Sequence, residues 1–158
     1  MKPRSWRCHD NYFGLLTGLL FFALLTGGCS TFNRDWKKAV ATPGAADTVE
    51  GCWEGTWLSA RNGHTGKLRC LATKTDDRQI RARFKATYWK IFRIGYEVTL
   101  NSESLPGDKV HIQGENDLGW WGGGVYHYSG TISPTNFSST YRSKYDHGTF
   151  EMKRPGPE

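Results

Sequence analysis

Residues 79–89 read QIRARFKATYW, and this stretch decides the fold class of the chain. Apolar or small side chains stand at every second position, and polar or charged side chains fill the positions between them. The first set is Ile80, Ala82, Phe84, Ala86 and Tyr88, and the second is Arg81, Arg83, Lys85 and Thr87. Successive side chains of a strand point to opposite faces, so this pattern predicts a strand with one buried face and one wet face.

Runs of the same kind recur at short intervals over the second two thirds of the chain. We predict strands over 52–59, 67–74, 79–89, 94–102, 109–116, 124–133, 135–143 and 149–154. Turn residues separate them, for example Asn62-Gly63 and Pro106-Gly107-Asp108. Strands joined in order by short turns form an antiparallel meander, and eight of them can close. The sequence therefore predicts an all-β fold, an eight-stranded antiparallel up-and-down barrel.

The start of the first predicted strand carries two glycine-tryptophan motifs, Gly51-Cys52-Trp53 and Gly55-Thr56-Trp57. Each resembles the G-x-W signature of lipocalins and their calycin relatives. In that family the tryptophan packs under the barrel against a basic residue from the last strand, and the resemblance implies that Arg154 is this residue. The family's T-D-x-x-Y motif does not occur in the sequence, so the expectation is a calycin-like shape with Trp53, Trp57 and Arg154 at the barrel floor.

A two-residue turn at 62–63 sets the expected register of the first hairpin. It places Trp57 opposite Leu68 and Trp53 opposite Ala72, with both tryptophans pointing inward.

The same register bears on Cys52 and Cys70. It places Cys70 opposite Gly55 on the inner face, whereas Cys52 has the opposite parity and faces outward. A disulfide needs Cβ atoms about 3.5 to 4.5 Å apart on one side of the sheet. A Cys52–Cys70 disulfide therefore requires a slipped or bulged hairpin, and the alternative is two free thiols.

The N-terminus has the layout of an export signal. Three cations, Lys2, Arg4 and Arg7, precede an apolar run that ends near residue 28. The end of the run, Leu25-Thr26-Gly27-Gly28-Cys29, resembles the bacterial lipoprotein signal, in which small residues precede a cysteine that receives a diacylglycerol. The resemblance implies removal of residues 1–28 and lipid on Cys29. An ordinary cleaved signal with an incidental cysteine is the competing interpretation.

This reading divides the chain into a signal peptide (1–28), a lipid-anchored flexible spacer (29–50), the barrel (51–154) and a short tail (155–158). Small residues and a Pro-Gly pair at 42–46 favour a spacer without fixed structure. Two interpretations of Trp36 stay open, namely that it rests on the bilayer surface or that it packs on the barrel. The expected location is a bacterial cell envelope, and Ser30 after the cysteine favours the outer membrane if there are two membranes.

Basic residues are in excess and gather on one predicted face. The chain has a formal charge of +6, and the part after residue 28 keeps 18 basic and 14 acidic residues, or +4. Arg69, Arg81, Arg83 and Lys85 have outward parity on neighbouring strands, which predicts a basic side that meets anionic headgroups or envelope polymers. A merely solvated face is the alternative. An exported, anchored protein rarely meets nucleic acid, so we expect no such partner.

The interior and the histidines decide between binding and catalysis. Many inward positions are aromatic, which favours a filled core, whereas glycines at 114, 122–124 and 130 leave room for a small apolar ligand. His111 and His127 would face each other, with Glu115 nearby, if a turn centred on residue 119, but a zinc site needs three or four ligands. We expect no metal, no cofactor and no enzyme activity. The predicted function is structural or binding, and a small hydrolase or metal-dependent enzyme using His64, Asp146 and His147 is the alternative.

Overall fold

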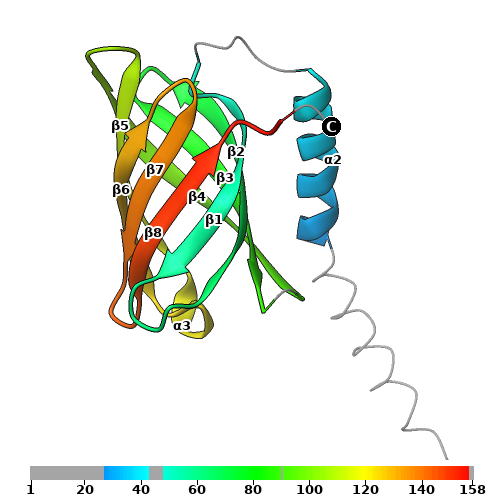
Figure 1. Cartoon of the computed structure of the whole chain (residues 1–158), viewed down its shortest axis with the longest axis vertical. Coiled ribbons are helices and arrows are strands. Elements are labelled where there is room, and N and C mark those ends of the chain that lie inside the picture. The colour runs from blue at the N-terminus through cyan, green and yellow to red at the C-terminus, as the bar shows by residue number, and fades with distance from the viewer. Residues whose placement is uncertain (1–26, 43–47, 90, 157–158) are drawn as a thin grey trace, which may run out of the picture.

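The computed structural model describes residues 27–42, 48–89 and 91–156. Its main body is a closed barrel in which each strand pairs antiparallel with its sequence neighbours (Figure 1). The strands are β1 (Gly51–Ser59), β2 (Thr65–Asp76), β3 (Gln79–Tyr88), β4 (Phe92–Leu105), β5 (Lys109–Asp117), β6 (Val125–Ile132), β7 (Asn136–Arg142) and β8 (His147–Lys153). The predicted all-β class and the eight-stranded up-and-down topology are confirmed.

The barrel closes between its first and last strands. The β1–β8 ladder runs from Glu54 opposite Lys153 to Ser59 opposite Gly148. At Gly55 the two backbones come so close that a Cβ atom would lie 1.9 Å from the Glu151 carbonyl oxygen. Only a residue without a side chain fits there, so Gly55 is part of how the barrel closes.

The inward positions of all eight strands form one hydrophobic core. Phe84 lies near its middle, with its ring centroid 5.2 Å from that of Tyr96 and 5.6 Å from that of Phe150. Trp53, Phe137 and Ile132 are at most 1% exposed. Aromatic side chains thus fill much of the interior, as expected from the number of inward aromatic positions.

The first hairpin has a longer loop than predicted. Leu58 pairs with Thr65, and the backbone N–H of Ser59 donates to the His64 carbonyl at 2.8 Å, which leaves four residues in the loop. Trp57 therefore pairs with Gly66 and Trp53 with Cys70, a shift of two residues from the expected register. An even shift keeps every side chain on its face, so the inward direction of both tryptophans was predicted correctly although their partners were not.

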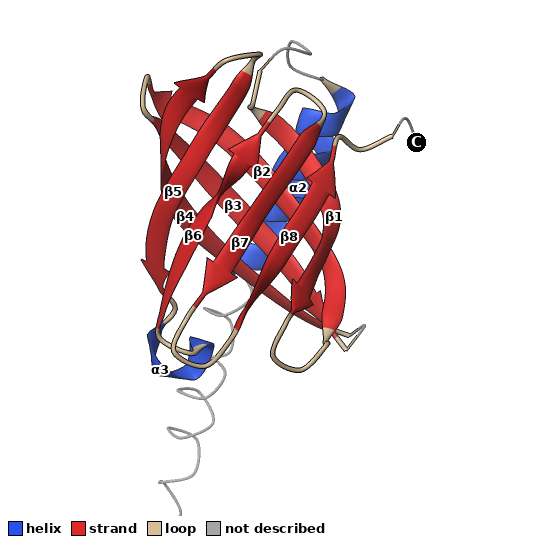
Figure 2. Ribbon diagram, turned by 60° about the vertical axis from the view of Figure 1, so that its left-hand side comes forward, coloured by secondary structure: helices blue, strands red, loops and turns tan. Residues whose placement is uncertain are grey.

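The two ends of the barrel differ, and we name them for use below. The floor carries the short β2–β3, β4–β5 and β6–β7 connections, and Trp53 lies near it. The mouth carries residues 60–64, 89, 91, 118–124 and 143–146, including the short helix α3 (Gly119–Gly122) (Figure 2).

A helix, α2 (Gly27–Ala41), lies along the outside of the barrel (Figures 1 and 2). This corrects the expectation of a flexible spacer over 29–50, of which residues 43–47 lie outside the described part. The helix is ordered by one apolar face, Phe32, Trp36, Ala39 and Val40, which packs on Cys52 of β1 and Leu71 of β2. No helix in the described ranges has the length and apolar character needed to cross a membrane. The predicted signal segment falls almost entirely in residues 1–26, outside those ranges.

Candidate functional site

The floor is closed by a tryptophan and an arginine. The Arg154 guanidinium lies 3.8 Å from the centroid of the buried Trp53 ring, and the indole N–H of Trp53 donates to the Val49 carbonyl at 3.0 Å. Both Trp53 and Arg154 are placed as the resemblance to calycins implies. The guanidinium also donates to four backbone carbonyls, those of Thr48, Glu50, Cys52 and Pro134. Burial lowers the pKa of Arg154 from its usual value.

Trp57 does not belong to this floor. It lies four residues further along β1, toward the mouth, where its indole N–H donates to the Thr87 carbonyl at 3.1 Å. Its ring centroid is 4.5 Å from that of Tyr88. Four residues of strand span about 13 Å, which explains why the second G-x-W motif cannot share the position of the first.

Helix α2 packs over part of the predicted basic face, so that Lys85 is buried and Arg83 half-buried beneath it. Arg69 lies 4.9 Å from the Trp36 ring centroid, and the Arg83 guanidinium and the Lys85 ammonium each lie 5.7 Å from that of Phe32. The Lys85 ammonium donates to the Asn33 amide oxygen at 2.8 Å. These cations therefore hold the protein's own helix.

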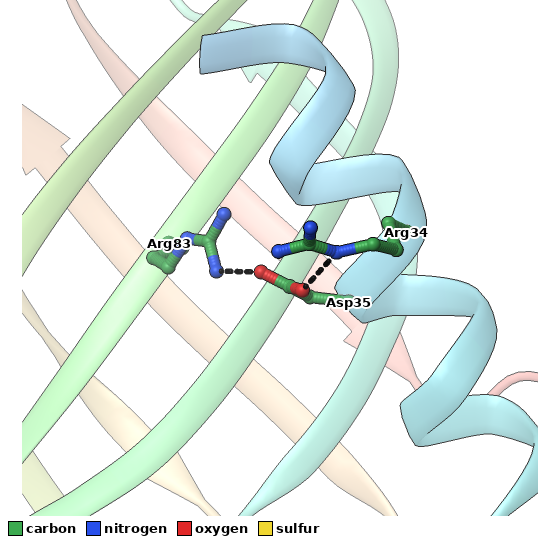
Figure 3. Close-up of polar contacts among 3 residues, drawn as sticks. All are labelled: Arg34, Asp35 and Arg83. Carbon is green, nitrogen blue, oxygen red and sulfur yellow. Dashed lines mark hydrogen bonds and ion pairs between the residues drawn. The ribbon is translucent and has the colours of Figure 1, made fainter. Parts of the chain in front are cut away.

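An aspartate completes this contact between helix and barrel. Asp35 accepts a hydrogen bond from Arg83 at 2.7 Å and one from Arg34 at 3.3 Å (Figure 3). The hydrogen bond from Arg83 is the largest cause of a lowered pKa for Asp35. Of the four residues predicted to bind anions, Arg69 and Arg81 stay exposed, whereas Arg83 is half-buried and Lys85 is buried.

Cys52 and Cys70 are both buried free thiols, so the structure has the second of the two expected arrangements and no disulfide joins them. Cys70 pairs with Trp53 and Cys52 with Leu71, which puts the two sulfur atoms on opposite faces of the sheet. The Cys52 thiol lies under the helix and contacts the Trp36 carbonyl oxygen at 3.8 Å. Burial raises the pKa of Cys52 to about 11 and that of Cys70 well above its usual value. The Cys29 side chain lies outside the described part.

An aromatic cavity of about 220 Å³ opens at the mouth and reaches into the barrel. Gly95 and Gly122 are among the residues that line it. Its lining includes seven aromatic side chains, Trp57, Tyr88, Tyr96, Tyr126, Tyr128, Tyr141 and Phe150. The interior is therefore neither fully packed nor hollow: the floor half is filled, and the mouth half keeps a small cavity.

Four of the five tyrosines that line this cavity have a raised pKa and stay neutral over the physiological pH range. Burial is the main cause of a raised pKa at Tyr88, Tyr96, Tyr128 and Tyr141. Their hydroxyls are consequently available as neutral hydrogen-bonding groups on otherwise apolar walls.

One carboxylate, Asp146, joins the cavity wall. It accepts a hydrogen bond from the Ser59 hydroxyl at 2.6 Å and one from the Tyr141 hydroxyl at 3.2 Å. It also accepts one from the backbone N–H of His147 at 2.8 Å. These donors hold the carboxylate in place at the point where the cavity meets a second, more open groove of about 590 Å³. This groove runs along the rim past His64, Trp89 and Arg93.

The histidines do not gather at a site. His127 pairs with Glu115 and lies 3.4 Å from its carboxylate, whereas His111 pairs with Thr131, because the β5–β6 connection centres on residue 121 and not on 119. Within the described ranges, no cluster of three or more histidine, cysteine, aspartate or glutamate side chains could hold a metal ion. Among the described hydrogen bonds, His147 reaches the Asp146 carboxylate through its backbone N–H and not through its ring, which is not the arrangement of a hydrolytic triad.

Sequence reasoning missed two parts of this picture. The spacing of Phe32, Trp36, Ala39 and Val40 is that of one helix face, and this signal was present in the sequence. The role of Asp146 was not visible, because it depends on Ser59, which lies 87 residues away in the chain.

No protein-family model matches the chain, and no curated protein matches it either. The class that the structure defines is a small, closed, antiparallel eight-stranded barrel, consistent with a calycin-like fold. Such a fold suits a binding or structural role.

Proposed function

We propose that the protein is a lipid-anchored lipoprotein of a bacterial cell envelope whose barrel binds a small, mainly apolar ligand at its mouth. The aromatic cavity with Asp146 in its wall is the observation that carries this proposal. Ligand sites in small barrels are commonly apolar with a few fixed polar groups, and this one has that composition on a small scale.

The chemistry of the wall narrows the ligand class. A volume of about 220 Å³ suits a compact molecule of roughly one aromatic ring with a short side chain. Aromatic faces attract cations, and a carboxylate favours a positively charged donor over an anion. An arylalkyl amine is therefore the favoured class, and Asp146 is the group that would accept its N–H.

Phenethylamine is a suitable probe, with its neutral and acidic counterparts, 2-phenylethanol and phenylacetate, as comparisons. We expect the amine to change the tryptophan fluorescence of the purified chain at lower concentration than either counterpart. Asp146→Asn should weaken binding of the amine at least tenfold. The asparagine keeps an amide oxygen that can accept the hydrogen bond from Ser59. Asp108→Asn, at the floor, is the matched control. Equal responses to all three probes, or the same affinity in Asp146→Asn, would show that the carboxylate does not select the ligand.

The anchoring part of the proposal rests on the sequence around Cys29 and has a separate test. The intact mass of protein extracted from bacterial membranes should correspond to a chain that begins at Cys29 and carries acyl groups. Cys29→Ser should keep the leader and gain no acyl mass. An unprocessed wild-type chain without acyl groups would refute the anchor and leave the ligand proposal standing.

A further inference from the structure

The exposed apolar side chains of the described chain are concentrated at one end of the barrel. Nine large apolar side chains are exposed in the described part of the chain, and eight of them lie at the mouth: Leu58, Trp89, Ile91, Phe92, Ile94, Trp120, Val125 and Tyr145. Leu105, at the floor, is the ninth. An apolar rim of this kind is unusual on a protein surface and marks a contact with a partner or a membrane.

The tip of the β3–β4 hairpin projects most clearly. Trp89 is 71% exposed, Ile91 73% and Phe92 56%, and the Trp89 and Phe92 rings pack edge to face with centroids 6.1 Å apart. Trp120 on α3, 82% exposed, adds a second aromatic group to the same end. Tryptophans beside aliphatic side chains are typical of the boundary between headgroups and acyl chains.

Exposed charges lie at both ends of the barrel. The exposed cations Arg61, Arg93 and Lys144 lie at the mouth, next to the apolar rim. The floor turns carry the exposed acids Asp76, Asp77 and Asp108 beside the exposed cations Arg78 and Lys109, and Asp117 is an exposed acid at the mouth. The cations beside the apolar rim suit the phosphates of an anionic bilayer.

Helix α2 brings the N-terminal part of the chain to the same end. Strand β3 runs from floor to mouth, so Lys85 lies nearer the mouth than Arg83. Asp35 bonds Arg83 and Asn33 bonds Lys85, so the helix runs antiparallel to β3, with its first residues toward the mouth. Position 29 lies about 6 Å further along the helix axis than Asn33. Figure 1 shows the start of α2 near the tip of the β3–β4 hairpin.

We propose that the barrel docks mouth first on an anionic phospholipid bilayer. Trp89, Ile91 and Phe92 enter the boundary between headgroups and acyl chains, and Arg93 and Lys144 face lipid phosphates. The inference relies on the proposed function only for the presence of a bilayer near Cys29. In this orientation the mouth cavity opens toward the membrane, so an apolar ligand exchanges between the barrel and the lipid phase.

Depth measurement at two engineered positions tests this orientation. The full chain is reconstituted into vesicles of phosphatidylethanolamine and phosphatidylglycerol, with a nitroxide label on Ile91→Cys or on the matched control Leu105→Cys. Both substitutions replace exposed apolar side chains, at opposite ends of the barrel. The wild-type chain, treated in the same way, reports any label on its own cysteines, and circular dichroism confirms that each variant is folded.

We expect the label at position 91 to collide several-fold more with oxygen than with a water-soluble nickel chelate, and the label at 105 to show the reverse. Equal exposure of both labels to the nickel chelate would overturn the docking. Spin–spin coupling between labels at position 91 would overturn it as well, because a second copy of the chain would then cover the rim. The intact mass of the same sample shows separately whether Cys29 is acylated, so failure of the anchor and failure of the docking are distinguishable.

Discussion

Asp35 of α2 accepts a 2.7 Å hydrogen bond from Arg83 of β3 and so ties the helix to the outside of the barrel. Around this bond, Phe32 and Trp36 lie against cations of the sheet and cover Cys52. The helix is thus held by one ion pair, the Lys85–Asn33 hydrogen bond, three cation–π contacts and a small apolar cluster. Each can be disturbed without touching the barrel interior.

Asp35→Asn should loosen the helix. The amide keeps the shape but loses the charge that Arg83 pairs with, so α2 opens more often and exposes Cys52. We expect the alkylation rate of Cys52 at pH 8 to rise several-fold, measured by mass spectrometry of peptides, while that of the fully buried Cys70 stays unchanged. Arg34→Ala is the control, because the Arg34 side chain is 77% exposed and its partner is its own neighbour. Equal alkylation rates of Cys52 in the wild type and in Asp35→Asn would contradict the role of the ion pair in holding the helix.

Acid should release the same helix. The pKa of Asp35 is lowered in the folded state, below its ordinary value of 3.8, chiefly by the Arg83 hydrogen bond. The stabilisation is therefore fully present above 3.8 and is lost as the pH falls through the folded pKa. Subtracting the tryptophan emission of Trp36→Phe from that of the wild type should reveal a transition below pH 3.8. Asp35→Asn should lack this transition, and its persistence there would assign it to another group.

Arg154 should contribute more to stability than an ordinary surface cation. Arg154→Ala removes the stacking on Trp53 and leaves backbone carbonyls of the floor without their donor, so we expect the free energy of unfolding to fall by about 3 kcal/mol. Arg154→Lys should recover only part of this free energy, because an ammonium group cannot reproduce the planar arrangement of donors of a guanidinium. Denaturant titration measures both. Lys153→Ala, at the neighbouring exposed position, should stay within about 0.5 kcal/mol of wild type.

Gly55→Ala tests how tightly the barrel closes. The added methyl group would overlap the Glu151 carbonyl, which belongs to the β8 backbone and cannot rotate away. We expect a loss of about 3 kcal/mol or more in the free energy of unfolding. Gly95→Ala is the matched strand control, since its added carbon would meet its nearest atom at an ordinary 3.7 Å. Similar stabilities for the two variants would mean that β1 and β8 can separate at Gly55 without cost.

The alternation of residues 79–89 and of the other strands was sufficient to predict the barrel. An even change in register between two strands leaves every side chain on the same face, so the prediction does not depend on the exact pairing. The length of the first loop was not predictable in this way. Asn62-Gly63 indicates a two-residue turn, but the hydrogen bond from the Gly63 N–H to the Ser59 carbonyl belongs to a four-residue loop. The Asn62-Gly63 motif therefore located the turn correctly, but the cross-strand partners that it predicted were wrong by two residues.

The basic face shows a second limit of prediction from the sequence. The parity of Arg69, Arg83 and Lys85 correctly predicted that they point outward. Lys85 is nevertheless buried and Arg83 half-buried under α2, so an outward direction does not by itself expose a side chain to solvent. Whether an outward cation is free depends on α2, whose polar composition concealed an apolar stripe of only four residues. The mouth site depends even more on distant residues, because Ser59 and Asp146 meet only after β1 and β8 have paired.

That pairing also sets a time order for assembly. Glu54 and Lys153 lie about 100 residues apart in the chain, and contacts of such high sequence separation form slowly and late. Until the segment from His147 onward has been made, β1 has no partner on one side and its amide groups can bond to another chain. A half-built sheet is therefore open to pairing with other chains during synthesis, and a shortened product should aggregate instead of folding to a smaller barrel.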